Sequence, residues 1–201
     1  MNRRLKEGAL VNDLHFTSIG SIQIKVPDPS QMIHLQFRRF AGCPVCDLHL
    51  HSVARRGSEL SAASIREVVV FHSSAEALLP YYEGLPFDVV ADPDKKLYRQ
   101  FGVESGLRAL MSPLVWCPII RGVVGSLGRT LSGRAPLAPF NPSGGRLGLP
   151  ADFLIAPSGM IIACKYGSHA YDQWSVDEVL ELAARARSEV GGSVGKRVVA
   201  G

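Results

Sequence analysis

Residues 37–47 of this 201-residue chain read FRRFAGCPVCD, so that two cysteines, Cys43 and Cys46, stand three positions apart. The segment before them, 32–37, alternates apolar and polar residues as a β-strand does, and residues 47–62 carry apolar side chains at helical spacing. The cysteine pair therefore lies where a strand leads into a helix. Unpaired N–H groups and a partial positive charge at a helix N-terminus stabilise a thiolate, the reactive form of cysteine. This position predicts a redox dithiol.

The composition is that of an ordinary globular chain, with 46% hydrophobic and 20% charged residues. The net charge of +4 is scattered and forms no stripe suited to nucleic acid. Four cysteines, two of them in one C-x-x-C, do not make a disulfide scaffold. The basic start lacks the roughly 7 to 15 apolar residues of a secretory signal. We expect a cytoplasmic protein with a single domain over residues 1–190 and a disordered tail, 191–201.

Strand-like and helix-like segments alternate along the chain, which predicts an α/β fold with a central mixed sheet flanked by helices. The segments expected as strands are an N-terminal hairpin (14–17 and 22–26), 32–37, 65–71, 87–90 and a second hairpin (149–156 and 160–164). The segments expected as helices are 47–62 with a bend at Gly57, 75–79, about 93–101 with Asp92 capping it, and one opened by the capping box 175–178 and ending near 190–192.

Residues 104–148 break this alternation. The apolar part is interrupted by Pro113 and Pro118, which makes it too short and too broken to span a bilayer comfortably. The remainder is rich in Gly, Pro, Ser and Arg, and loops of this length inside a compact domain are usually functional or disordered. We interpret 104–148 as an insertion that covers or borders the active site, with a short helix around 114–124.

The order of strand, C-x-x-C, helix, strand, helix, proline, hairpin and closing helix resembles the thioredoxin fold over roughly residues 10–190. In thioredoxin-like proteins a cis proline precedes the hairpin and lies against the dithiol, and Pro150 matches that position. The resemblance therefore implies a cis Leu149–Pro150 bond and places Pro150 in the active site.

Three stretches, 37–46, 152–164 and 166–175, resemble more closely the peroxiredoxin-like branch of the alkyl hydroperoxide reductase/thiol-specific antioxidant (AhpC/TSA) family. That branch is similar to the prostamide/prostaglandin F synthases, which carry a comparable C-x-x-C. Peroxiredoxins use Pro-x-x-x-Thr-x-x-Cys to orient the peroxide. Setting Cys46 on the reactive cysteine puts Cys43 at the threonine and Arg39 at the proline. This departure argues against a standard fast peroxiredoxin but leaves dithiol exchange intact.

The roles within the pair have two interpretations. Resemblance to thioredoxin makes Cys43 the attacking thiolate and Cys46 the resolving thiol, and the peroxiredoxin alignment reverses them; we favour Cys43 as the nucleophile. By strand alternation, one of Arg38 and Arg39 should point toward the thiolate. We take Arg39 as the candidate, alongside the two cysteines and Pro150.

Other polar residues receive structural interpretations. His49 and His51 lie two apart on the expected helix, where they face different directions, and we read both as surface residues. Zinc requires four ligands, and Cys117 and Cys164 stand alone, so no metal or other cofactor is expected; both are read as buried hydrophobes. His169 and Trp174 are read as packing residues.

The leading functional hypothesis is a thiol-dependent oxidoreductase that cycles Cys43 and Cys46 between dithiol and disulfide. It would reduce a peroxide or a disulfide with electrons from a thioredoxin- or glutathione-type donor. The rival hypothesis is a non-catalytic thioredoxin-like binding or redox-sensing module that docks a partner or membrane surface through 104–148. A weaker alternative is reduction of a lipid endoperoxide. No nucleic-acid partner is expected, and the sequence does not predict the oligomeric state.

Overall fold

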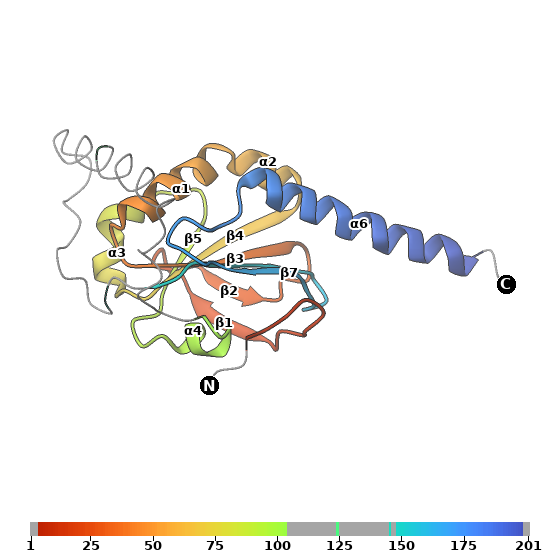
Figure 1. Cartoon of the computed structure of the whole chain (residues 1–201), viewed down its shortest axis with the longest axis horizontal. Helices are drawn as coiled ribbons and strands as arrows, with labels where there is room; N and C mark the ends of the chain where they lie inside the picture. The colour runs from red at the N-terminus through yellow and green to blue at the C-terminus, as the bar shows by residue number, and fades with distance from the viewer. Residues whose placement is uncertain (1–3, 104–123, 125–144, 146–147, 199–201) are drawn as a thin grey trace.

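The centre of the fold is a five-stranded mixed β-sheet (Figure 1) with strand order β5-β4-β3-β6-β7. The computed structural model describes residues 4–103, 124, 145 and 148–198, with side chains as far as Glu189. The sheet strands are β3 (Met32–Arg38), β4 (Ile65–Phe71), β5 (Asp88–Ala91), β6 (Ala151–Ile155) and β7 (Ile161–Tyr166). A separate antiparallel hairpin consists of β1 (Leu14–Thr17) and β2 (Gln23–Val26).

Strand β3 is the middle of this sheet. It pairs in parallel with β4 and antiparallel with β6, while β5 extends the parallel side and β7 the antiparallel side. A strand with neighbours on both edges and elements over both faces is buried on both sides. The predicted mixed sheet with its N-terminal hairpin is therefore confirmed, and its central strand delivers the chain to the dithiol.

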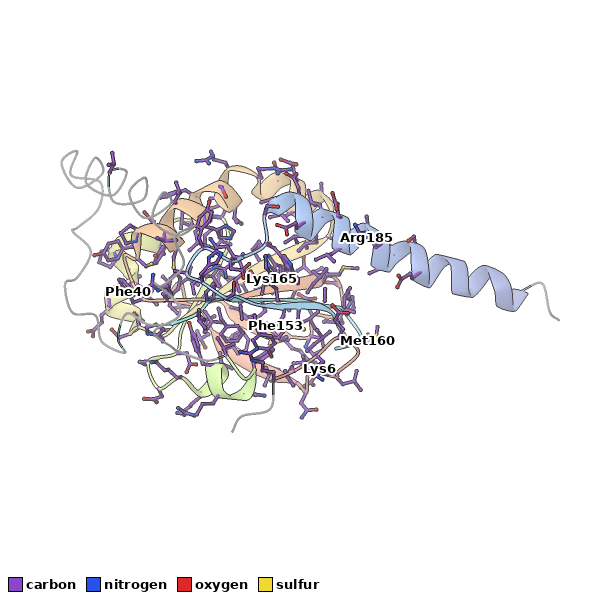
Figure 2. All side chains as sticks on the ribbon, viewed as in Figure 1. Lys6, Phe40, Phe153, Met160, Lys165 and Arg185 are labelled. Carbon is purple, nitrogen blue, oxygen red and sulfur yellow. The ribbon has the colours of Figure 1, made fainter. Side chains whose placement is uncertain are left out.

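Different elements cover the two faces of the sheet. The hairpin β1–β2 and helix α4 lie on one face, and the longer helices lie on the other (Figure 1). The helices are α1 (Pro44–Arg55), α2 (Gly57–Ala62), α3 (Ala75–Tyr82), α4 (Lys96–Gln100) and α6 (Val176–Val198). Phe40 lies at one end of the sheet, beside the start of α1, and Met160, in the β6–β7 turn, lies at the opposite end (Figure 2). The dithiol thus belongs to the end marked by Phe40.

Helix boundaries agree with the sequence at Gly57, whereas α1 and α4 start at other residues than expected and α3 ends later, at Tyr82. The expected bend is a break between α1 and α2 at Arg56. Helix α1 starts at Pro44, earlier than expected, because proline at the first helical position needs no hydrogen-bonded N–H. Helix α4 starts at Lys96, later than expected: Lys95 adopts a left-handed conformation, while the Asp92 carboxylate accepts the first N–H groups of the helix.

The C-terminal helix is longer than the sequence predicts. The pair Gly191-Gly192 suggested an end near 190–192 and a disordered tail beyond it, but α6 continues to Val198 and extends away from the sheet (Figure 1). Glycine costs a helix only about 1 kcal/mol relative to alanine, and the backbone hydrogen bonds need no side chain. The helix therefore passes its expected end, and the domain boundary at residue 190 stays a prediction.

The predicted insertion, 104–148, and its helix lie outside the described residues apart from 124, 145 and 148. The expected cis bond at Pro150 is wrong. The cis peptide bond among the described residues is Val26–Pro27, and the bond from Leu149 to Pro150 is trans. The cis expectation rested on resemblance to thioredoxin alone, and a trans bond is favoured by about 0.5–1 kcal/mol when nothing local opposes it.

Candidate functional site

The dithiol is presented by a tight turn between β3 and α1. Gly42 has φ of +72°, and a Cβ there would lie 2.7 Å from ring atoms of Tyr81, so this position requires glycine on both counts. The Cys43 N–H donates to the Phe40 carbonyl, and the Ala41 N–H donates to the Ser73 hydroxyl at 3.0 Å. The turn is therefore fixed by the chain that follows β4, at the edge where the parallel strands end.

Cys43 is the residue that caps α1. It has extended backbone angles, its carbonyl accepts the Asp47 N–H, and its side chain is 1% exposed. Burial alone would raise its pKa, but a hydrogen bond from the Cys46 thiol, the charge of Arg39 and the N–H groups of Cys46 and Val45 outweigh burial and lower the pKa of Cys43 below that of an ordinary thiol. Cys43 is thus the more acidic thiol of the pair.

Cys46 behaves in the opposite way. It is as buried as Cys43, and burial, followed by its hydrogen bond to Cys43 and the charge of that neighbour, raises its pKa well above the ordinary value. Cys43, Cys46 and Cys164 are free thiols in this structure. The pKa values of the two thiols are thus shifted in opposite directions, and a thiol with a lowered pKa is the better nucleophile in thiol exchange.

The two neighbouring arginines have separate environments. Arg39, which is 4% exposed, places its Nη1 3.7 Å from the Cys43 sulfur. Arg38 is fully buried and points to the other side, where its Nη2 lies 2.6 Å from an Asp152 oxygen. Strand alternation predicts that one of the two arginines reaches the thiol. That residue is Arg39, which lies just beyond the end of β3.

Arg38 belongs to a group that we term the buried polar network, which lies between the sheet and helix α1. The His34 Nδ1 is 2.8 Å from a Glu67 oxygen, and its Nε2 is 3.3 Å from Asp152. The Gln36 amide bonds to both Glu67 and Arg38. The network comprises six buried side chains: His34, Gln36, Arg38, His49, Glu67 and Asp152.

Charges within the network neutralise one another. Burial alone would lower the pKa of His34, but Glu67 and Asp152 together raise it to about 9, so the imidazole is protonated at neutral pH. Burial would likewise raise the pKa of Asp152, but Arg38 and His34 hold it well below its usual range. Two cations therefore face two carboxylates in a site buried from solvent.

Several sequence interpretations need revision here. His49 is not a surface residue: it is 6% exposed, its Nε2 lies 3.3 Å from Arg38, and burial lowers its pKa well below the ordinary value. His51 is partly exposed beside Asp47. Trp174 packs with its ring 5.8 Å from the His34 ring, as a packing residue should. Cys164 is half-buried, and Cys117 lies outside the described residues.

Pro150 is buried at the start of β6. Its carbonyl accepts the Gly167 N–H at 2.8 Å, and a Cβ on Gly167 would lie 2.7 Å from the proline ring. These contacts join the beginning of β6 to the end of β7. A role for Pro150 at the dithiol stays a prediction.

His72, which is not among the predicted site residues, directly follows β4 and is 2% exposed. The signal was available, since a polar residue at the carboxyl end of a buried parallel strand lies at the edge where α/β proteins bind ligands. Nothing comparable points to a metal: within the described ranges no group of three or more His, Cys, Asp or Glu side chains could hold an ion. Nor is any helix in those ranges long and apolar enough to cross a membrane.

Comparison with known protein families decides the classification. The family described as AhpC/TSA antioxidant enzyme matches residues 52–169, more than half of the chain. The chain belongs to this family. Its members are thiol-dependent oxidoreductases, so the predicted enzyme class is confirmed. The matched segment begins after Cys46, so the dithiol itself is not covered by the match.

Solved peroxiredoxins share the fold. Peroxidoxin BcpB from Mycobacterium tuberculosis superposes with a TM-score of 0.63 at 13% identity, covering 90% of this chain and 98% of that one. The 2-Cys peroxiredoxin of Plasmodium vivax gives 0.61 at 11% identity, covering 93% and 84%. Peroxiredoxin 6 of Arenicola marina gives 0.62 at 13% identity, covering 91% and 74%. No curated protein sequence matches the chain. The thioredoxin-like fold is confirmed, whereas none of these three structures is a prostamide/prostaglandin F synthase.

Proposed function

We propose that Cys43 and Cys46 form the redox centre of this AhpC/TSA enzyme, with Cys43 as the thiolate that attacks a peroxide and Cys46 as the thiol that resolves the product. The observation that carries this proposal is the opposite direction of the two pKa shifts, downward for Cys43 and upward for Cys46. The thiolate is the nucleophile in such reactions, so the more acidic thiol acts first.

The reaction balances with the two sulfurs alone. The Cys43 thiolate attacks the terminal oxygen of a hydroperoxide; an S–O bond forms, the O–O bond breaks, and an alkoxide leaves and takes a proton from solvent. Cys43 is then a sulfenic acid, oxidised by two electrons. The Cys46 sulfur attacks it, releasing water and leaving a Cys43–Cys46 disulfide. A thioredoxin- or glutathione-type thiol donor would return the disulfide to the dithiol.

Burial favours a small oxidant over a protein disulfide. Cys43 and Cys46 are each 1% exposed. Exchange with a protein disulfide would require the partner protein to bring its sulfur atom into contact with one of these buried thiols. Arg39 supports the same step, because its guanidinium stabilises the attacking thiolate. Reduction of a lipid endoperoxide stays a weaker alternative, since it depends on the apolar segment within 104–148.

The test is peroxide consumption by the purified full chain, with Cys43→Ser and Cys46→Ser variants. Cys43→Ser should reduce the single-turnover rate to the uncatalysed background. Cys46→Ser should still react once and accumulate a Cys43 sulfenic acid, detected by dimedone labelling and mass spectrometry.

Cys164→Ser is the matched control, because that half-buried thiol lies in β7 and should leave the rate unchanged. Dimedone labelling of Cys46 in the Cys43→Ser variant, at the wild-type rate, would reverse the assigned roles. A wild-type rate above background in the Cys43→Ser, Cys46→Ser double variant would exclude the dithiol as the redox centre. A wild-type chain no faster than the uncatalysed background would support the non-catalytic binding or sensing module.

A further inference from the structure

His72 is a buried imidazole that the chemistry above does not use. It stands one residue beyond the end of β4, is 2% exposed, and neither its Nδ1 nor its Nε2 has a hydrogen-bond partner in the described part of the chain. More than nine in ten buried polar groups in folded proteins are paired. An imidazole with both nitrogens unpaired therefore suggests a site for a ligand atom.

The imidazole faces the same edge of the sheet as the dithiol. Gly148 packs closely against His72 and Arg39: a Cβ there would lie 3.1 Å from the His72 Nε2 and 3.7 Å from the Arg39 Cα. Arg39 in turn contacts the Cys43 sulfur, and the next residue, Ser73, accepts the Ala41 N–H of the dithiol turn. His72 therefore lies beside Arg39, the residue that contacts the thiol, just beyond the paired ends of β3 and β4.

The imidazole is neutral under physiological conditions. Burial, followed by the charge of Lys95, lowers the pKa of His72 to about 4, and Arg39 acts in the same direction, against opposing effects of the residue's own backbone and of Asp92. A neutral imidazole keeps one N–H donor and one acceptor nitrogen. It can donate a hydrogen bond to a developing negative charge without adding a second positive charge beside Arg39.

We propose that His72 donates a hydrogen bond from Nε2 to the leaving oxygen of the hydroperoxide that Cys43 attacks. The proposal rests on the function proposed above and adds a substrate-contacting residue to it. As the O–O bond breaks, negative charge accumulates on that oxygen, and a buried, prepositioned N–H stabilises it more than water would. The imidazole keeps its proton throughout, and the alkoxide is protonated by solvent. In this way a histidine from the chain after β4 supplies part of the peroxide orientation that the missing threonine supplies in peroxiredoxins.

The first test compares His72→Ala with His72→Gln, whose amide N–H can reach the position of Nε2. His72→Ala should lower the second-order rate with a hydroperoxide on the order of 100-fold, the effect of removing one such donor. His72→Gln should recover a measurable part of that loss. Alkylation of Cys43 by iodoacetamide reports the thiolate alone and should be unchanged in both variants. Equal losses in peroxide and iodoacetamide rates would overturn the proposal, because His72 would then act on the thiolate or the fold.

The second test leaves His72 in place. Gly148→Ala puts a methyl group against Nε2 and should lower the peroxide rate at an unchanged alkylation rate, whereas Gly57→Ala, whose Cβ would meet only Pro86 at 3.7 Å, is the matched control. Wild-type peroxide rates in both His72→Ala and Gly148→Ala would refute the role of His72. The Cys43→Ser result decides the proposed function independently of either variant.

Discussion

The two faces of strand β3 are equally buried but chemically opposite. Ile33, Leu35 and Phe37 point into an apolar core shared with β2, β4, β6 and α4, while His34, Gln36 and Arg38 point into the buried polar network. On the first face stabilisation comes from removing apolar surface from water. On the second, the ionisable groups are tolerated only because each one meets a partner, so the polar face is the one more sensitive to losing a single group.

This difference matters for the dithiol because β3 ends beside it. The polar face places Arg38 against Asp152, which neutralises that guanidinium within the network. Arg39 follows the strand and is directed to Cys43 instead. The two adjacent arginines therefore have different contacts: Arg38 pairs with Asp152 within the buried polar network, and Arg39 contacts the Cys43 thiol.

The largest effect is expected from breaking the polar face at its carboxylate. Asp152→Ala leaves the Arg38 guanidinium and the His34 imidazolium without a shared partner, and should lower the free energy of unfolding by about 3–5 kcal/mol. Urea denaturation followed by far-ultraviolet circular dichroism measures this loss.

Asp177→Ala is its control. Asp177 also pairs with an arginine, Arg56 at 2.7 Å, but its side chain is 71% exposed, so solvent already screens the pair and the change should be small. The double variant Arg38→Met, Asp152→Leu should be more stable than Asp152→Ala, because it removes both charges together. Equal stabilities of Asp152→Ala and the wild type would show that the network contributes nothing.

A second, smaller effect is a pH dependence of the free energy of unfolding, which should come from the polar face of β3 and not from the apolar face. Because Glu67 and Asp152 raise the pKa of His34 from its ordinary 6.5 to about 9 despite its burial, the stabilisation it provides is complete below pH 6.5 and is lost as pH rises through about 9. Unfolding free energy should therefore fall between pH 6.5 and 9.5, by roughly 2–3 kcal/mol. Urea titrations at the two pH values test this.

The apolar face supplies the control for the pH experiment. Leu35→Ala should cost about 2–5 kcal/mol at both pH values, because no proton is involved in burying a leucine. His34→Gln should flatten the pH dependence of the parent chain. If Leu35→Ala changed the slope as much as His34→Gln does, the division between the two faces would not hold.

Local patterns explain why the position of the dithiol could be predicted from the sequence. Alternation over 32–37, the C-x-x-C and Gly57 each act within a few residues, and the structure agrees with all three. By the same alternation, His34, Gln36 and Arg38 lie on one face of β3. Alternation could not show that this face is buried, because the partner carboxylates are 33 residues away at Glu67 and 118 residues away at Asp152.

Other differences have the same origin in distant contacts. His49 was read as exposed because its own helix does not reveal that Arg38 lies beneath it. The position of His72 after β4 marks it in the sequence, but its closeness to Arg39 depends on the pairing of β4 with β3, which sets Phe71 beside Arg38. The difference at Pro150 has another origin. The cis bond was expected from resemblance to thioredoxin and not from the local sequence, and this chain has a trans bond there.

The smallest predicted effect concerns the residue at which the alternation of β3 stops. Arg39→Met removes the charge that helps to lower the pKa of Cys43, so less thiolate is present at pH 7 and the rate of iodoacetamide alkylation should fall roughly 3- to 10-fold. Arg39→Lys keeps the charge and should retain most of the rate. His34→Gln alters the polar face without touching the thiol, and its alkylation rate should match the wild type. If Arg39→Met alkylated as fast as Arg39→Lys, the hydrogen bond from Cys46 and the helix N–H groups would suffice to activate Cys43, and the separation of the two arginines would have no consequence for the chemistry.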